Sequence, residues 1–275
     1  MNRLTSYGFT FALIYLAILE GNAGDHVMLM YGFVLSVILA YSAFFLTWLT
    51  LDATLPAIII GTAVLGFGGW ILAVALIVFF ITGSLFSRLN HYHSSIKSTE
   101  LKPETRRDGL QVWANGFWGV IFVIAFYLFP GEYFLGAAFG VIATATADTW
   151  ATETGVRSRG KTINLKTREA VKPGTDGGVS LRGTLFSLIG ALLIGFFASQ
   201  GLRSEPILVF SSIAAAGFLG CLIDSYIGAV LQQKREPDQT DGFWNSTDHA
   251  KQNSMVNWIS TGSGGFIALI LLLIF

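Results

Sequence analysis

Long apolar runs along the chain alternate with short polar breaks. Because runs of this length predict membrane helices, the pattern gives nine candidate helices, near residues 7–19, 27–49, 54–67, 70–87, 110–129, 133–149, 181–199, 206–232 and 255–275. The first and third runs are shorter than the about 20 residues that a full crossing needs. The predicted fold class is therefore all-α, a polytopic transmembrane helix bundle with about seven to nine membrane helices.

Two of the polar breaks are only a few residues long and contain glycine. Gly68-Gly69 follows the third apolar run, and Pro130-Gly131 follows the fifth. Glycine and proline interrupt helices and favour tight turns. Each break therefore predicts a hairpin of two antiparallel helices.

Composition supports a membrane protein and excludes several function classes. The chain is 53% hydrophobic and 12% charged, and its mean hydropathy is +0.61. A soluble core of 275 residues could not bury so much apolar surface, so residues 1–275 are expected to form a single integral membrane domain. The formal net charge of zero gives no field that would attract nucleic acid. The single cysteine, Cys221, excludes an internal disulfide and a multi-cysteine metal site.

The positive charges predict how the helices are oriented in the membrane. Nine crossings place the loops 88–109, 150–180 and 233–254 on the same side as the N-terminus. These loops, their margins and the N-terminus hold all of the 17 Lys and Arg residues except Arg203. Positive residues concentrate in cytoplasmic loops, so the N-terminus and the three loops are expected to be cytoplasmic.

Carboxylates within the apolar runs are candidate functional groups. Asp148 lies at the end of the run 133–149, and Asp224 lies about 12 Å inward from the end of the run 206–232. Ionisable side chains at membrane depth usually face a site or a partner. Glu153 follows Asp148 by five residues, which is about 140° around an unbroken helix. Either the helix breaks between them, or the two carboxylates face different partners.

Amide side chains lie at the same predicted membrane surface as these carboxylates. Asn115 and Asn257 lie near the starts of two other membrane helices. Structural hydrogen bonds between helices would explain any one of these polar groups. Their convergence from several helices on one surface favours a functional site at the inner leaflet.

The stretch KPGTDGGVSLRGT, residues 172–184, is unusually polar for this chain. Glycines at 174, 177 and 178 allow the backbone to direct N–H groups at a ligand. Ser180 can cap the following helix, and the N-terminus of that helix would attract an anion. Lys172 and Arg182 add positive charge. The stretch is not a Walker A loop, and a plain interfacial turn is the alternative. With carboxylates nearby, the combination favours Mg²⁺-dependent phosphate chemistry on a lipid-like substrate.

Three sequence blocks carry a resemblance to a known family. The runs ADTWATETG (147–155), KPGTDGGVSLRGT (172–184) and GCLIDSYIGAVLQ (220–232) resemble the signature blocks of an integral membrane family that includes plant phytyl-phosphate kinase and animal transmembrane protein 19. The similarity extends over about residues 30–265. It implies a CTP-dependent kinase that adds a second phosphate to a prenyl monophosphate such as phytyl or geranylgeranyl phosphate. It also implies kinship with phytol and dolichol kinases and with CTP-dependent lipid cytidylyltransferases.

The kinase hypothesis assigns a role to each candidate residue. The predicted catalytic residues are Asp148, Glu153, Lys172, Asp176 and Asp224. Of these, Asp148, Glu153 and Asp224 are the predicted Mg²⁺ ligands. The predicted substrate- and nucleotide-binding residues are Asn115, Gly174, Thr175, Gly177, Gly178, Ser180, Arg182, Thr184 and Asn257.

Two alternatives to the kinase remain at this point. A CTP-dependent lipid cytidylyltransferase would use the same ligands but release pyrophosphate, and a membrane transporter would use intramembrane carboxylates for ion coupling. The expected partners are CTP, a prenyl-phosphate lipid and the membrane, with no nucleic acid; a homo-oligomer is compatible with the sequence. No Ser/Arg-rich leader of the plastid type precedes the first apolar run, which favours a prokaryotic plasma membrane with the site on its cytoplasmic face.

Overall fold

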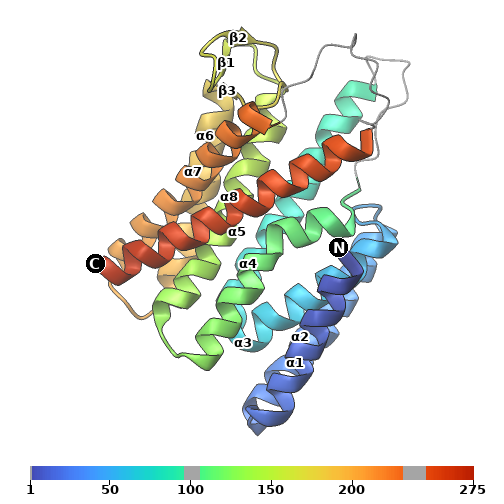
Figure 1. Ribbon diagram of the computed structural model, residues 1–275, viewed down its shortest axis with the longest axis vertical. Helices are drawn as coiled ribbons and strands as arrows, with labels where there is room; N and C mark the ends of the chain where they lie inside the picture. Colours follow the sequence, from blue (N-terminus) through green and yellow to red (C-terminus); the bar gives the residue numbers. More distant parts are fainter. Residues whose placement is uncertain (1, 96–105, 232–245) are drawn as a thin grey trace.

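The computed structural model describes residues 2–95, 106–231 and 246–275. Within these ranges the chain forms eight helices and a small β-sheet at one end of the bundle (Figure 1). The helices are α1 (Asn2–Leu19), α2 (Ala23–Phe45), α3 (Leu51–Ser95), α4 (Gly109–Leu128), α5 (Glu132–Gly155), α6 (Leu181–Gly201), α7 (Pro206–Leu231) and α8 (Ser246–Ile274).

Seven of these helices, α2 to α8, are long and apolar enough to cross a membrane. The remaining helix, α1, is a shorter apolar helix. Large apolar side chains on the outside of the bundle, such as Phe11, Phe196 and Ile207, are exposed as expected for a surface that faces lipid. The predicted all-α polytopic membrane fold is confirmed.

Helix α3 is a hairpin of two arms rather than one long rod. Gly69 has a φ of 79° and a ψ of −179°, which breaks the helix at that residue. At the other end of the arms, Arg88 Nη2 donates to Thr47 Oγ1 at 3.0 Å. The end of the second arm therefore lies beside the start of the first, as the Gly68-Gly69 break predicts.

Helix α5 lies at the centre of the bundle and packs against α3, α4, α6, α7 and α8. Of its apolar stretch, 78% is buried, compared with at most 44% in any other candidate span. Small residues allow this close packing: a side chain at Gly217 of α7 would collide with Ala143, and one at Gly264 of α8 would collide with Thr144. The position of α5 fixes the side chains at its end relative to three neighbouring helices.

The loop predicted over 150–180 is more ordered than the sequence indicates. Helix α5 continues to Gly155, past the predicted end at residue 149, and three short strands follow. Strands β1 (Thr162–Asn164), β2 (Ala170–Val171) and β3 (Gly178–Ser180) form an antiparallel sheet in the order β2-β1-β3. The sheet leads directly into α6, because Ser180 ends β3 and caps that helix.

The described parts of the three basic loops lie at the same end of the bundle (Figure 1). Asn90 Nδ2 of α3 donates to the Glu153 backbone carbonyl of α5 at 2.5 Å, and Asn253 of α8 lies near the sheet segment. Residues 96–105 and 232–245, which belong to the predicted loops 88–109 and 233–254, lie outside the described residues. The loop predicted over 233–254 is shorter than predicted, because α8 begins at Ser246 rather than near residue 255.

Candidate functional site

A polar cavity of about 150 Å³ lies at the sheet end of the bundle. Its walls come from α5, α6, α7, the start of α8 and the segment around β3. These are the elements that carry the three blocks singled out in the sequence. The cavity therefore brings together residues that are far apart in the chain.

Two carboxylates form one wall of the cavity. Asp148 of α5 and Asp224 of α7 face each other within hydrogen-bonding reach. Ser260 Oγ of α8 donates to Asp224 Oδ2 at 2.7 Å, and the Asn257 amide nitrogen, in the orientation that satisfies its neighbours, donates to the same oxygen at 3.2 Å. Two carboxylates this close repel each other unless a proton or a cation lies between them.

Glycines on neighbouring helices bring the two carboxylates together. A side chain at Gly220 of α7 would collide with Thr144 of α5, one turn before Asp148. Gly190 of α6 also lies close to α5, since a side chain there would come within 3.2 Å of Thr146 and 3.4 Å of the Ala147 backbone. Because both neighbours approach the α5 backbone closely, Asp224 reaches the level of Asp148.

The glycine-rich segment forms the opposite wall. Gly174, Thr175, Gly177 and Gly178 all line the cavity. Gly177 has a φ of +70°, and a side chain there would collide with Ala229 of α7. Only glycine satisfies both conditions without strain, so this residue lets the segment pack against α7.

The N-terminus of α6 also faces the cavity. Ser180 caps the helix, since its Oγ accepts a hydrogen bond from the Gly183 backbone N–H at 3.1 Å, and both Gly183 and Thr184 line the cavity. Unpaired N–H groups and the helix dipole make such an N-terminus favourable for an anion. The predicted role of Ser180 as a cap is confirmed.

Asp176 contributes a third acidic residue to the cavity lining. Its backbone carbonyl accepts a hydrogen bond from Asn164 Nδ2 at 3.4 Å, which ties the segment to β1. Asp176 therefore lies on the loop wall, across from the Asp148–Asp224 pair.

The two residues predicted to supply cationic contacts, Lys172 and Arg182, are not among the residues that line the cavity. Both residues are exposed. Arg182 Nη1 donates to the Arg157 carbonyl at 3.4 Å, and its guanidinium lies 6.0 Å from the centre of the Phe186 ring. The physical reason is helical geometry: Gly183 and Thr184 face the cavity, so Arg182 points to the other side of α6.

The structure does not bring Glu153 to the Asp148–Asp224 pair with which it was predicted to share a metal site. Helix α5 is unbroken between Asp148 and Glu153, so the two side chains point in different directions. Glu153 accepts hydrogen bonds from Ser87 Oγ and Asn90 Nδ2 of α3. Within the described part of the chain, no group of three His, Cys, Asp or Glu side chains is placed to hold a metal ion.

Asn115 is another predicted site residue that the structure places away from the polar cavity. Its side chain donates to the Gln111 carbonyl in its own helix at 3.1 Å, and it lines a different, apolar cavity between α2, α3 and α4. Sequence analysis placed Asn115 at the correct end of its helix, but the direction of the side chain depends on how α4 is rotated in the bundle.

Several polar residues of the cavity were not predicted. Thr162, Ser187 and Ser225 line it together with Asn253. Thr162 Oγ1 and Ser187 Oγ are buried and have no hydrogen-bond partner among the described residues. Helical spacing could have identified Ser187, which lies on the same face of α6 as Gly183 and Thr184. Nothing in the sequence indicates that Thr162 folds back over the cavity.

The residues present fit a hard divalent cation such as Mg²⁺. The carboxylates that line the cavity are Asp148, Asp176 and Asp224, and all offer oxygen ligands. Proteins commonly hold Mg²⁺ through one or two carboxylates, water and substrate phosphates. The facing Asp148–Asp224 pair would hold the ion, with Asp176 on the opposite wall.

A comparison with known families accounts for most of the chain. Residues 34–265 match the family described as integral membrane protein DUF92. This range contains every residue that lines the polar cavity. The chain belongs to this family.

Relatives in the DUF92 family occur in archaea, cyanobacteria and plants. An uncharacterized membrane protein of Methanocaldococcus jannaschii is 32% identical over 80% of this chain and 84% of its own length. An uncharacterized membrane protein of Synechocystis is 29% identical over 75% of each chain. Protein PGR of Arabidopsis thaliana is 30% identical over 57% of this chain and 63% of its own length. No solved structure matches the chain.

Proposed function

We propose that this DUF92 protein is a prenyl-phosphate kinase that transfers the terminal phosphoryl group of CTP to a prenyl monophosphate. The observation that carries the proposal is the arrangement of the polar cavity. There the Asp148–Asp224 pair faces the glycine-rich segment and the N-terminus of α6. Paired acidic ligands opposite backbone N–H groups suit a metal-bound polyphosphate.

The reaction needs few protein groups beyond those in the cavity. A phosphate oxygen of the prenyl monophosphate attacks the γ-phosphorus of CTP, and the bond from that phosphorus to the β-phosphate oxygen breaks. The products are the prenyl diphosphate and CDP. The attacking oxygen is already anionic near neutral pH, so no strong general base is needed. Phosphoryl transfer depends mainly on positioning and on stabilisation of negative charge.

The residues of the cavity divide this work between them. Mg²⁺ would neutralise charge on the polyphosphate when bound to Asp148 and Asp224. Ser260 and Asn257 hold the Asp224 carboxylate in place through hydrogen bonds. The backbone of the segment 174–178 and the first turn of α6 would bind phosphate oxygens. Thr162 and Ser187 carry buried hydroxyl groups that could donate to the same oxygens.

A membrane-embedded acceptor explains why such a cavity lies at the ends of membrane helices. The phosphate of a prenyl lipid would lie at the membrane surface, and its hydrocarbon tail would remain in the bilayer. The resemblance of the three sequence blocks to phytyl-phosphate kinase supports a prenyl acceptor and CTP as the donor. The positive charge at this end of the bundle supports a cytoplasmic cavity, from which soluble nucleotide can enter.

The reaction can be tested with purified protein in detergent. Mixed with Mg²⁺, CTP and geranylgeranyl monophosphate, the protein is expected to form geranylgeranyl diphosphate and CDP, measured by mass spectrometry. The variants Asp148→Asn and Asp224→Asn are each expected to lower turnover by about 100-fold or more, because they remove charge from the metal-binding pair. Asp52→Asn is the matched control: Asp52 lies at the start of α3 and accepts hydrogen bonds from Thr50 and Gly109.

The products also distinguish the kinase from the related enzyme class. Release of pyrophosphate together with a CDP-lipid would identify a cytidylyltransferase at the same site. If both aspartate variants unfolded at the same temperature as the unmodified protein and kept full turnover, the proposed site would be wrong.

A further inference from the structure

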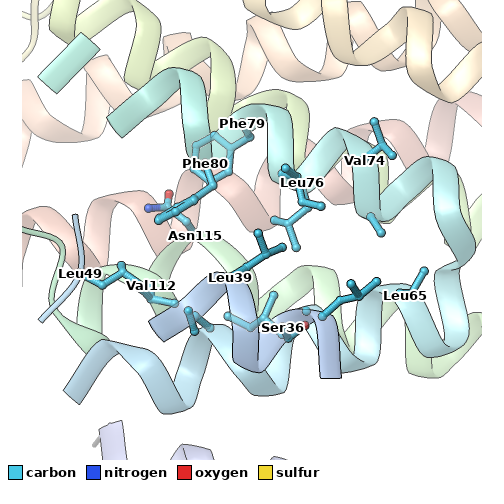
Figure 2. Close-up of a pocket in the computed structure, with 18 of the residues that line it drawn as sticks. Ser36, Leu39, Leu49, Leu65, Val74, Leu76, Phe79, Phe80, Val112 and Asn115 are labelled. Atoms are coloured by element: carbon cyan, nitrogen blue, oxygen red, sulfur yellow. The ribbon is translucent and has the colours of Figure 1, made fainter. Parts of the chain in front are cut away.

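A second cavity, of about 180 Å³, lies between α2, the two arms of α3 and α4. Figure 2 shows its lining, which runs from Leu49 and Asn115 at one end to Leu65 and Val74 at the other. Almost all of its lining residues are apolar. On the first arm of α3 the lining extends from Ala57 to Leu65, a length of about 12 Å along the helix. The cavity is therefore elongated and apolar.

This cavity is open toward the lipid-facing side of the bundle. Leu35 and Leu39 of α2, together with Trp70 and Val74 of α3, line the cavity and are also exposed. Exposed apolar side chains on membrane helices face lipid chains. A hydrocarbon chain can therefore enter from the bilayer between α2 and the second arm of α3.

The end of the cavity near the basic loops contains a cation. The Arg107 guanidinium lies 5.3 Å from the centre of the Phe79 ring and 5.7 Å from that of Phe80. Burial lowers the pKa of Arg107 from its ordinary value, and the nearby Glu153 carboxylate opposes this effect. Arginine remains charged under these conditions, so an additional anion would stabilise it.

Beyond Arg107 lies a smaller polar cavity of about 10 Å³, enough for about one water-sized atom. It is lined by Trp48, Ser84 and Arg88 as well as Arg107. Trp48 Nε1 and Ser84 Oγ are buried there, and neither has a hydrogen-bond partner within the described ranges. Buried donors without partners are unfavourable, and an anionic oxygen placed between them and Arg107 would satisfy them.

The charged residues that line the small cavity within the described ranges are two arginines. Arg88 and Arg107 line the small cavity, and the facing acidic side chain, Glu153, already accepts hydrogen bonds from Ser87 and Asn90. An apolar channel that ends at positive charge and unpaired donors complements an anionic amphiphile.

We propose that this cavity binds a segment of one acyl chain of an anionic membrane phospholipid, whose phosphate contacts Arg107. Engineered cavities of about 150 Å³ bind one benzene-sized group, so this cavity of about 180 Å³ holds part of a single chain, and the rest of that chain lies in the bilayer. The second chain of a phospholipid would stay in the bilayer, outside the opening. Bilayer phospholipid is present at far higher concentration than any metabolic intermediate, so it occupies even a weak site by mass action.

This lipid site is separate from the Asp148–Asp224 cavity. Helix α5 lies between them, with Thr149 and Glu153 directed toward α3 and Asp148 directed toward α7. The proposal therefore does not depend on the kinase reaction.

The test uses photoactivatable lipids in nanodiscs of phosphatidylcholine. Two probes carry the same diazirine on an acyl chain, one in phosphatidylglycerol and one in phosphatidylcholine. The anionic probe is expected to label peptides of α2 and α3 about tenfold more strongly than the neutral probe, as one charge-assisted hydrogen bond would allow.

Two pairs of variants locate the chain and the head group. Val74→Trp fills the opening at a position that is 41% exposed, and this variant is expected to reduce labelling about fivefold. The control is Leu219→Trp, at a 44% exposed position on α7, which should leave the labelling unchanged. Arg107→Gln is expected to bring the ratio of anionic to neutral labelling to about 1. Arg182→Gln removes an exposed cation from the same end of the bundle and should preserve the ratio.

Three results would overturn the proposal. Equal labelling by the two probes in the unmodified protein would remove the evidence for an anion site. Equal labelling of Val74→Trp and Leu219→Trp would show that the chain lies elsewhere, and this holds even if Arg107→Gln does not fold. Complete displacement of the anionic probe by geranylgeranyl monophosphate at the same mole fraction would identify a prenyl phosphate as the occupant instead.

Discussion

Asp224 shows how single side chains organise the polar cavity. Its Oδ2 atom accepts hydrogen bonds from Ser260 and from Asn257, both on α8, while its carboxyl group faces Asp148 on α5. The three helices therefore meet at one carboxyl group. Hydrogen bonds from two neutral donors stabilise a negative charge there, which is the form that a cation binds.

Gly177 is a second residue on which the cavity depends. In Gly177→Ala the added methyl group would collide with Ala229 and would also be strained at a φ of +70°. We expect the glycine-rich segment to detach from α7 and the hydrogen bond from the Leu165 N–H to the Gly177 carbonyl to break, so that trypsin cleaves native protein after the neighbouring Lys166 about tenfold faster. The rate of cleavage, followed by mass spectrometry, measures this effect.

A matched variant separates this local effect from a general one. Gly160→Ala lies in the same exposed loop, where the nearest atom to the added methyl is Ser158 Oγ at 3.8 Å. Its cleavage rate should equal that of the unmodified protein. Adding Ala229→Gly to Gly177→Ala removes only the contact with Cβ, since the Cα and N atoms of residue 229 would still lie 2.5 and 2.6 Å from the added methyl, so the double variant should be cleaved as fast as Gly177→Ala. A cleavage rate for Gly177→Ala equal to that of Gly160→Ala would contradict the account.

At the scale of the elements, the sharpest feature is the bend in α3. At Gly69 the backbone adopts a φ of 79° and a ψ of −179°, a region that is essentially restricted to glycine. A side chain there would meet no atom within 4 Å. Any effect of substitution must therefore come from the backbone conformation and not from packing.

Gly69→Ala is expected to lower the free energy of unfolding by about 1–3 kcal/mol. Gly8→Ala is the control, because Gly8 also has open space around it but lies in α1 without a positive φ, and alanine favours a helix by about 0.5–1 kcal/mol. Thermal unfolding in one detergent, followed by tryptophan fluorescence, compares the two. Equal shifts in the two variants would mean that the bend is not strained.

The sequence predicted the membrane helices well, because long apolar runs separated by short polar breaks define them. The break at Gly68-Gly69 and the short turn after α4 are present, and all nine predicted helical segments correspond to α1–α8, with α3 counted as two arms. The strands β1 to β3 were missed because they contain only two or three residues each and form through pairing with one another. Such short strands leave no alternation that a sequence can reveal.

The site was predicted in part, for a related reason. Asp148, Asp176, Asp224 and the glycines of the segment 174–178 meet at one cavity, because helix ends on one membrane surface had already limited where they could lie. Glu153, Asn115 and Arg182 lie at the same end of the bundle but point elsewhere. The rotation of each helix about its axis depends on packing with its neighbours, which a single sequence does not specify.

At the scale of the whole molecule, the basic segments predicted to share one side of the membrane lie at one end of the helix bundle. The sheet, the end of α3, the start of α6 and the start of α8 lie at one end of the bundle (Figure 1), whereas Arg203 lies at the other end, between α6 and α7. There the Arg203 and Ser204 backbone N–H groups donate to the Glu132 carboxylate at 2.9 and 3.0 Å. This distribution predicts that the two ends face different compartments.

Cysteine labelling tests this orientation. Lys161→Cys and Arg203→Cys place a thiol at opposite ends, and the native Cys221 is buried, so the unmodified protein is the control for background. In intact cells a membrane-impermeant maleimide should label Arg203→Cys, and it should label Lys161→Cys only after permeabilisation. The reverse pattern would place the polar cavity outside the cell and would contradict a cytoplasmic source of nucleotide.

The central position of α5 has a consequence for how molecules can travel within this protein. The helix lies between the polar cavity and the apolar cavity, and it packs closely against five neighbouring helices. We expect a lipid that leaves the apolar cavity to reach the acidic pair through the surrounding membrane, around the outside of the bundle. The two compartments of this protein can therefore fill and empty independently.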